Sequence, residues 1–415
     1  MIGKIKVSTI AQIIIALIGI CGIGYTILDN YQELMTFFLS LCLLCYKGHK
    51  SGVLKLQKKH YCFSFLIMAF CVLICISYVY SLNRMITFKY ALQFGLLTII
   101  AFCNYQKDFM YNTIITITKL SVFVTFTVIF SVIFPDIFKM MFGWYFADKN
   151  AVYQMIDQRL AVGIVGHNAY ASGISNLCIG YCMASIFSKR NVVNKDWIIG
   201  IIGLLAVLMT GKRILLVSLG ITILVLLFLN ISKEQKKRIL LIILIGIIVF
   251  LIMYTSIPAS RRVVERIIDG LGDSTFNNRA IFWSEAMYLF SQKKLLGWGF
   301  GVFPYYDKYF GSGWGYSAHN QYFELLAELG LIGLVLFCLI VSSTLGVTIK
   351  LLCDKNAMKV PMNAFITFFV FYYQMWYVIY GLTGTPLYNY SQQFLFVVLS
   401  MFTISLYYKN KWREG

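Results

Sequence analysis

Charged residues are scarce in this sequence. They make up 13% of its 415 residues, whereas 59% are hydrophobic and 17% are aromatic, and the mean hydropathy is +0.75. A soluble chain carries about 25% charged residues and few long apolar runs. The composition therefore excludes a soluble protein. Because no segment outside the apolar runs is long enough for a separate soluble domain, we predict one integral membrane domain over residues 1–415.

Residue types that bind metals and cofactors are also few. There are four histidines, with no H-x-x-x-H pair, and no Asp-x-Asp pair that could hold a metal–nucleotide-sugar complex. The eleven cysteines lie mostly inside apolar runs, and the Cys42-Leu-Leu-Cys45 pair stands alone, without the second pair or histidines that zinc requires. The glycine run 297–301 follows no predicted strand, so it is no dinucleotide fingerprint. We expect neither metal nor cofactor.

Acidic residues are scarcer than basic residues: the sequence has 17 Asp and Glu and 36 Lys and Arg, which gives a formal net charge of +19. The basic residues lie in short clusters between apolar runs. They form no continuous basic arm and no nucleic-acid-binding motif, which argues against a nucleic-acid partner. Positive charge in this position instead decides how a membrane protein is oriented.

Apolar runs of the length needed to cross a bilayer recur along the whole chain. We predict an all-α polytopic membrane protein with about twelve transmembrane helices. The predicted spans are 8–29, 33–46, 61–81, 86–103, 112–134, 169–187, 197–210, 213–230, 239–256, 320–349, 361–380 and 391–408. If both termini are cytoplasmic, the inside segments carry 21 Lys and Arg and the short outer connections carry 3. That asymmetry obeys the positive-inside rule. The first run has no clear cleavage site, so we expect a retained helix.

Two long outer loops remain, 135–168 and 257–319. The second lies between helices 9 and 10 and is predicted to be partly helical. Its segment 261–271 has the pattern of an amphipathic helix at the membrane interface. A second helix is expected to begin near Asn277 or Asn278, either of which could cap it, and to end near Ser291. Glycines then break the chain into turns, and the aromatic side chains between them suit sugar rings and a membrane interface equally.

Two cationic positions are candidates for binding an anion. Lys212 and Arg213 lie in a very short outer connection, where positive charge opposes the predicted topology. They either bind a phosphate-like anion, for which the Arg fork is suited, or extend to lipid phosphates. Arg279 shares a predicted helix face with Trp283 and either binds a ligand or stacks on that ring.

His319 is the candidate base. It follows Ser317, which could cap the next helix and so place His319 in its first turn. The positive end of a helix lowers a histidine pKa, which favours the neutral imidazole that a general base needs. Asn320 and Glu324 follow on the same helix, Glu324 on a different face from His319. A structural histidine at a membrane interface is the alternative.

His167 and Asn168 open the sixth span from the other long loop. Two outer histidines could suggest zinc, but no second ligand motif accompanies them.

Several of these residues lie in stretches that resemble the O-antigen ligase/polymerase family of bacterial envelope glycosyltransferases. The clearest is Leu296-Gly-Trp-Gly-Phe-Gly301, followed by the stretch from Ala318-His-Asn to Gly330-Leu-Ile-Gly333. Arg279 and Trp283 resemble the R-x-x-x-W that precedes the glycine run in that family. The Thr210–Arg213 stretch resembles the family's Ser-Arg loop, with Lys212 replacing the small residue. The stretch from Arg159 to His167-Asn168 resembles another family motif, with His167 where proline is common.

The resemblance implies a metal-independent glycosyltransferase of the bacterial cytoplasmic (inner) membrane with its active site on the outer face. The donor would be a glycan on undecaprenyl diphosphate. Arg213, Arg279, Arg159 and Lys212 would then stabilise the leaving diphosphate, and His319 would accept or orient the acceptor proton with Asn320 and Glu324 in support. His167, Asn168, Tyr316 and Trp314 would contact substrate. Expected partners are the glycan donor and acceptor, membrane lipid, and a chain-length regulator and flippase of the same pathway.

Within that family we favour a polymerase of oligosaccharide repeat units, producing a capsule or O-antigen polysaccharide. The alternative is a ligase that transfers finished polymer to a lipid, protein or wall acceptor. A lipid-linked sugar flippase or solute transporter is the alternative of another class. It would need ionisable residues within the spans, for which Lys89 and Lys119 are the obvious candidates, and no internal repeat supports it.

Overall fold

The computed structural model describes residues 7–20, 31–45, 61–188, 193–229 and 274–411, with residues 237, 240–241, 243–244, 246–248, 251–252 and 255 between them. Regular structure in these residues is helical throughout, and no strand occurs among them. The prediction of an all-α protein is confirmed.

The helices follow the chain as α1 Val7–Ile20, α2 Gln32–Cys45, α3 Tyr61–Ser77, α4 Arg84–Ala101, α5 Lys107–Ile133, α6 Pro135–Phe142, α7 Lys149–Asp157, α8 Asn168–Phe187, α9 Asn194–Met209, α10 Arg213–Phe228, α13 Ser274–Gln292, α14 Phe303–Phe310, α15 Gln321–Cys353, α16 Lys355–Lys359, α17 Pro361–Tyr380 and α18 Tyr390–Lys411. The described residues between 240 and 255 are helical as well. Every predicted span therefore overlaps a helix where its residues are described, although several spans extend a few residues beyond the helix.

Four of the described helices are long and apolar enough to cross a membrane by length and composition, namely α5, α15, α17 and α18. Helices α1, α3 and α10 contain shorter apolar stretches. The chain thus has the helices of a multi-pass membrane protein. The number twelve stays a prediction.

The structure differs from the sequence prediction in three places. The loop 135–168 contains two helices, α6 and α7. Asn277 and Asn278 lie within α13, which already includes Ser274, so the prediction that either one caps this helix is wrong. The tenth predicted span is interrupted at Gly330, whose φ of 62° and ψ of −159° are not helical. The predicted amphipathic helix 261–271 lies outside the described residues.

The interruption at Gly330 is where the glycine run 297–301 crosses α15. A Cβ on Gly330 would lie 2.4 Å from the carbonyl carbon of Leu295. A Cβ on Gly297 would lie 2.3 Å from the carbonyl carbon of Glu328. Only glycine allows this approach at a positive φ. The Glu328 carboxylate accepts hydrogen bonds from the backbone N–H groups of Gly301 and Phe303, at 2.7 and 2.8 Å. The glycine run 297–301 therefore allows the backbone to pack closely against α15.

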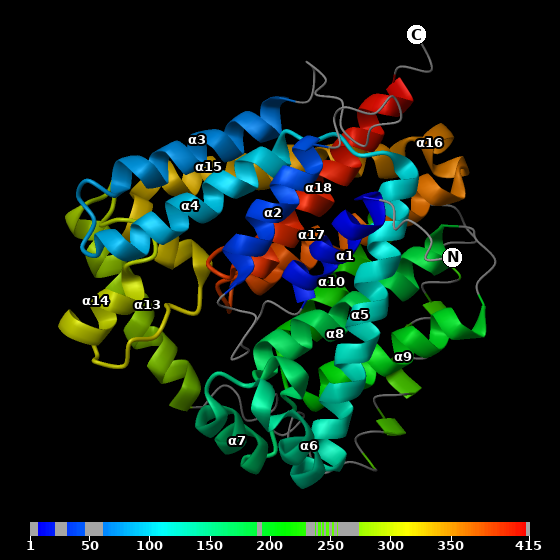
Figure 1. Ribbon diagram of the computed structural model, residues 1–415, viewed down its shortest axis with the longest axis horizontal. Coiled ribbons are helices and arrows are strands. Elements are labelled where there is room, and N and C mark those ends of the chain that lie inside the picture. Colours follow the sequence, from blue (N-terminus) through cyan, green and yellow to red (C-terminus); the bar gives the residue numbers. More distant parts are fainter. Residues whose placement is uncertain are drawn as a thin grey trace.

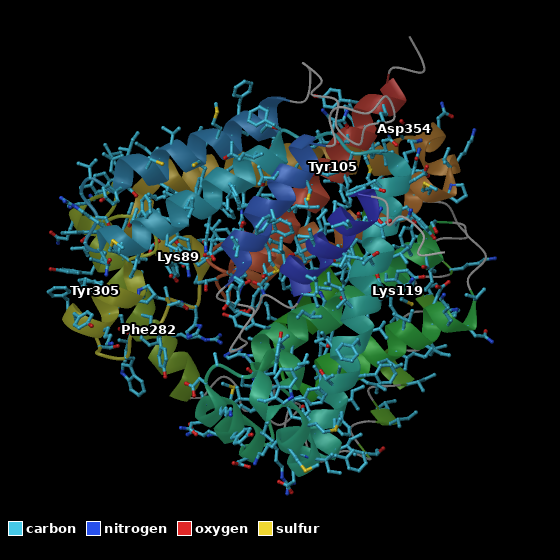
Figure 2. All side chains as sticks on the ribbon, viewed as in Figure 1. Lys89, Tyr105, Lys119, Phe282, Tyr305 and Asp354 are labelled. Carbon is cyan, nitrogen blue, oxygen red and sulfur yellow. The ribbon has the colours of Figure 1, made fainter. Side chains whose placement is uncertain are left out.

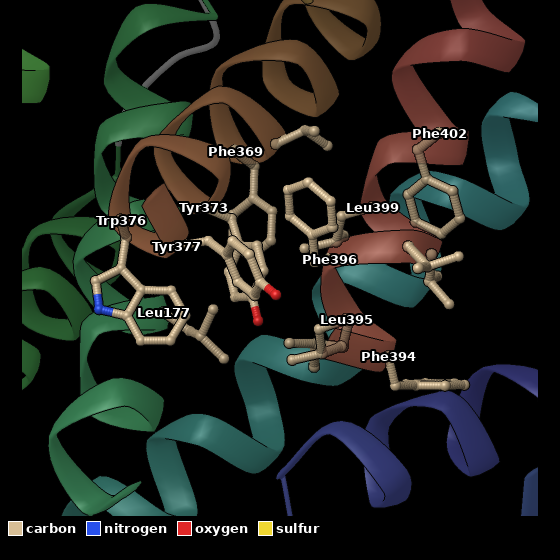
Figure 3. Packing of buried hydrophobic residues seen from close by; sticks show 14 of the residues in the cluster. Leu177, Phe369, Tyr373, Trp376, Tyr377, Phe394, Leu395, Phe396, Leu399 and Phe402 are labelled. Atoms are coloured by element: carbon tan, nitrogen blue, oxygen red, sulfur yellow. The ribbon is translucent and has the colours of Figure 1, made fainter. Parts of the chain in front are cut away.

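The main core lies where α8, α17 and α18 pack together with α5 and α1 (Figure 3). Its largest side chains are aromatic, such as Tyr377 and Phe396, whose rings stack with centroids 4.3 Å apart. Some polar groups in this core are paired: Tyr373 donates to the Gln392 carbonyl at 2.9 Å, and Gln374 donates from Nε2 to Thr344 at 2.8 Å. Such pairing reduces the cost of burying a polar group in an apolar interior.

Helix direction determines where the polar connections meet. Figure 1 shows α13 and α14 beside the ends of α3 and α4, projecting from one side of the bundle. In Figure 2, Phe282 on α13 and Tyr305 on α14 lie on that side, whereas Tyr105 and Asp354, which follow α4 and α15, lie on the opposite side. The connections on the side of α13 form the candidate site.

Candidate functional site

A cavity of about 820 Å³ lies where four helices begin and two end. The first residues of α8 and α10 line it, as do residues of the connection between α17 and α18 and of the segment before α15. Helix N-termini carry partial positive charge and unpaired N–H groups, which favour anions. The position alone therefore suits a negatively charged ligand.

Three cations from two separate parts of the chain line this cavity: Lys212, Arg213 and Arg279. Arg213 is the first residue of α10, and Arg279 comes from α13. None of the described lining residues is a carboxylate. The cavity, which we call the cationic cavity, thus brings together three of the four predicted diphosphate-binding residues.

Arg159, the fourth, is not among the described lining residues. It lies on an exposed turn after α7, with a φ of 58°. The structure does not bring it to the other three cations.

His319 lines the same cavity and precedes α15 by two residues. Asn320, not Ser317, is the N-cap: its Oδ1 accepts from the N–H groups of Tyr322 and Phe323, at 3.0 and 3.2 Å. The prediction that Ser317 caps the helix and that His319 lies in its first turn is therefore wrong. His319 adopts a φ of 49°, a left-handed backbone conformation that is uncommon for residues other than glycine.

Two neighbours hold this unusual backbone through Ala318. The Trp283 indole N–H donates to the Ala318 carbonyl at 3.0 Å, and the Ala318 N–H donates to the Glu324 carboxylate at 2.9 Å. Glu324 is buried and is not among the cavity's lining residues. Trp283 lies one turn after Arg279 on α13, which explains the spacing of that pair. Glu324 and Trp283 are thus positioning residues for His319.

Burial, together with the charges of the cavity, favours the neutral form of His319. Burial, followed by the positive charges of Arg279 and Lys212, lowers the pKa of His319 from 6.5 to about 4. The sequence predicted the direction but attributed it to the helix N-terminus. Burial and then Arg279 lower the pKa of Lys212 to about 8. An uncharged imidazole therefore lies beside cations at neutral pH, as a proton acceptor requires.

His167 is the N-cap of α8 and lines the cavity with Asn168. Its Nδ1 accepts from the Ala169 N–H at 3.2 Å. In the neutral ring the remaining proton is then on Nε2. Burial, Lys212 and His319 lower the pKa of His167 to about 4, so that ring is neutral too.

Tyr316 and Trp314 lie outside the cavity's described lining, but Tyr316 contacts His319 and Trp314 contacts Tyr316. The Tyr316 and His319 ring centroids are 6.5 Å apart, and those of Trp314 and Tyr316 are 5.9 Å apart. Asp307 of α14 fixes this loop by accepting from the N–H groups of Gly315 and Tyr316, at 2.6 and 3.0 Å. Both aromatic side chains are about half exposed or more, at 49% and 62%.

The wall of the cavity formed by the connection between α17 and α18 was not predicted from the sequence. Its members are Tyr380 at the end of α17, Gln392 in α18 and, between the two helices, Thr383, Gly384, Thr385, Tyr388 and Asn389. The Gln321 N–H donates to the carbonyls of Gly381 and Gly384, at 2.9 and 3.1 Å, which ties this connection to the start of α15. The polar stretch between two strongly apolar spans was a signal that could have identified it.

Comparison with known proteins gives a family match for part of this chain. Residues 198–338 match the family described as O-antigen ligase, a range that contains Lys212, Arg213, Arg279 and His319. A search of curated proteins found no match. The resemblance to the O-antigen ligase/polymerase family is therefore confirmed, and it covers residues 198–338 of this helical membrane protein.

Proposed function

We propose that this protein polymerises oligosaccharide repeat units carried on undecaprenyl diphosphate, at the outer leaflet of a bacterial cytoplasmic membrane. The observation that carries the proposal is the meeting of Lys212, Arg213 and Arg279 with a neutral His319 in one cavity without a described carboxylate. The match to an O-antigen ligase family supports glycosyl transfer from a lipid-linked glycan.

The reaction follows from these charges. A hydroxyl oxygen of the acceptor glycan attacks the anomeric carbon of the donor, and the bond from that carbon to the diphosphate oxygen breaks. Its electron pair leaves with undecaprenyl diphosphate, whose growing charge Arg213, Arg279 and Lys212 stabilise. The hydroxyl proton passes to His319. A covalent intermediate would need a second nucleophile such as a carboxylate, and none lines the described part of the cavity, so we expect inversion.

Donor binding also prepares the base. Arg279 and Lys212 contribute to the low pKa of His319. A bound diphosphate would compensate both positive charges and so raise that pKa, because a nearby anion favours the imidazolium form. His319 would then become a stronger proton acceptor when the donor is present.

The isoprenoid part of such a donor has an apolar surface along the same helix. Leu216, Leu219 and Ile223 of α10 line a separate apolar cavity of about 280 Å³, together with residues of α8 and α9. Arg213 precedes Leu216 by three residues and so shares a helix face with it. A diphosphate bound at Arg213 could therefore extend its lipid along α10.

The test is a deletion strain in which the lipid-linked glycans are sized after complementation. Loss of a polymerase leaves single repeat units on the carrier at the outer leaflet. Loss of a ligase, the alternative that the family description favours, leaves long polymer on the carrier. Loss of a flippase leaves single units on the inner leaflet. Polymer of normal length and yield from a His319→Ala variant, present at normal levels, would rule out the proposed site.

A further inference from the structure

A second cavity, of about 600 Å³, adjoins the cationic cavity. The two have four lining residues in common: His167, Tyr170, Tyr388 and Asn389. The remaining walls come from the first turn of α2, from the first turns of α4 and from Tyr390, the first residue of α18. Both volumes lie in the range of about 300–1,000 Å³ that is usual for small-ligand sites.

The charge of the second cavity is balanced. Its described lining contains one cation and one carboxylate, Lys89 and Glu33, whose nearest charged atoms are 3.7 Å apart. Gln93 donates from Nε2 to the same carboxylate at 2.6 Å. The Glu33 carboxylate would repel a diphosphate in this cavity. The adjoining cationic cavity instead offers three cations that no described carboxylate compensates. We call this second space the neutral cavity.

The polar groups of the neutral cavity match a ligand rich in hydroxyl groups. Gln32, Gln93 and Asn389 contribute amides, Glu33 a carboxylate acceptor, and Tyr90 and Tyr390 aromatic rings. Asn389 Oδ1 accepts from the Gln392 N–H at 3.1 Å, and its Nδ2 group donates to no described residue. Amides and carboxylates together can both donate to and accept from sugar hydroxyls.

A rigid aromatic stack supports the shared wall. Phe300 of the glycine run is fully buried, and its ring stacks on Tyr388 with centroids 4.8 Å apart. The Phe300 ring also makes a T-shaped contact with the Tyr90 ring, with centroids 5.1 Å apart. A fixed wall between two ligands allows their reacting groups to be aligned.

We propose that the neutral cavity binds the acceptor glycan. The attacking hydroxyl of the glycan then reaches the donor where the two cavities adjoin, at His167 and Asn389. This inference rests on the proposed function. His167 lines both cavities, and its Nδ1 accepts from the Ala169 N–H at 3.2 Å, which fixes the position of its ring in this wall. The bonds that form and break are those of the glycosyl transfer above.

The test measures binding of two probes to the purified full-length protein in detergent. One probe is undecaprenyl diphosphate. The other is the reducing oligosaccharide that mild acid releases from the lipid-linked glycans of the same cells. Glu33→Gln should weaken oligosaccharide binding about tenfold, as expected for loss of a hydrogen bond to a charged group, and leave undecaprenyl diphosphate binding unchanged. Arg213→Gln should give the opposite pattern.

A second variant tests the cavity without disturbing the core. Met85 is 76% exposed at the cavity rim, so Met85→Trp should obstruct the cavity in a folded protein and weaken oligosaccharide binding. Met140→Trp is the matched control, because Met140 is 77% exposed on α6 and lines neither cavity.

The inference is overturned if Glu33→Gln and Met85→Trp both bind the oligosaccharide as the unmodified protein does. The proposed function would survive that result if Arg213→Gln still lost undecaprenyl diphosphate binding and glycan transfer. The proposed function itself fails if Arg213→Gln and His319→Ala transfer glycan normally.

Discussion

The cationic cavity and the neutral cavity share a wall, yet they come from different parts of the chain. The three cations and His319 of the cationic cavity all lie within residues 198–338, which match the O-antigen ligase family. None of the described residues lining the neutral cavity lies in that range. In our proposal, the chemistry of the leaving diphosphate resides within the matched residues 198–338. Recognition of the acceptor, in our proposal, resides in the surrounding helices.

The largest expected effect comes from removing the base from the cationic cavity. His319→Ala should lower the rate of glycan transfer about 10²–10⁴-fold, the usual contribution of general acid–base catalysis. Undecaprenyl diphosphate binding should persist, because the three cations remain. Single-turnover transfer and ligand binding, measured on the same preparation, check both. Normal transfer by this variant would remove His319 from the mechanism.

The pH dependence of kcat/KM tests the state of that base. Since burial and two cations lower the pKa of His319 to about 4, the neutral form prevails above that pH. The acid limb should therefore lie near pH 4, with activity falling as the pH falls through that value. Arg279→Gln removes one of the two positive charges that lower the pKa of His319, so the acid limb should shift to higher pH. An acid limb unmoved by this substitution would contradict the coupling.

Loss of one diphosphate-binding cation should have the next largest effect. Arg213→Gln or Arg279→Gln should each reduce transfer about 10²–10³-fold, as when one preorganised group that stabilises developing charge is lost. Arg159→Gln is the control, because Arg159 is exposed and lies outside the cavity's described lining. A comparable loss in Arg159→Gln would show that the cavity extends to that turn.

The support of the shared wall can be weakened through the crossing at Gly330. Gly330→Ala should lower the free energy of unfolding by about 1–3 kcal/mol or more, because its Cβ would meet the Leu295 backbone at 2.4 Å and φ is 62°. Gly346→Ala, in the same helix with no atom within 4 Å of its Cβ, should change stability by at most about 1 kcal/mol. Thermal unfolding in detergent compares the two, and equal effects would contradict the packing argument.

The smallest effect is expected from loosening the backbone before His319. Trp283→Phe removes the indole donor to the Ala318 carbonyl, worth about 0.5–1.5 kcal/mol. kcat should fall by up to about tenfold with KM nearly unchanged, since no group that binds the diphosphate is lost. A change in KM alone would assign Trp283 to substrate binding instead.

Much of the fold could be predicted because membrane helices follow from local hydropathy. The predicted span 361–380 has the bounds of α17, and most others agree within a few residues. The break at Gly330 could not be predicted, because it is caused by a crossing with a segment some thirty residues earlier. Helix starts were less certain: Asn320, not Ser317, caps α15 because its side chain reaches two N–H groups.

The candidate site was predicted in part. Lys212, Arg213, Arg279 and His319 were conspicuous because charged and titratable residues are rare in so apolar a chain. Glu324 was expected to support the chemistry directly, and its contact with the Ala318 N–H depends on a backbone turn that no periodicity reveals. Asn389 and the neutral cavity were missed because amides and tyrosines in short connections carry no local signal. Only tertiary packing brings α2, α4 and that connection together.

The central claim is that the cationic cavity binds the diphosphate of the donor beside His319. The most direct measurement is an experimental structure of the protein with undecaprenyl diphosphate bound. We predict that the phosphate oxygens lie within about 3 Å of the Arg213 and Arg279 guanidinium groups, the distance of a charge-assisted hydrogen bond. Phosphates bound elsewhere, with the cationic cavity left open, would contradict the account.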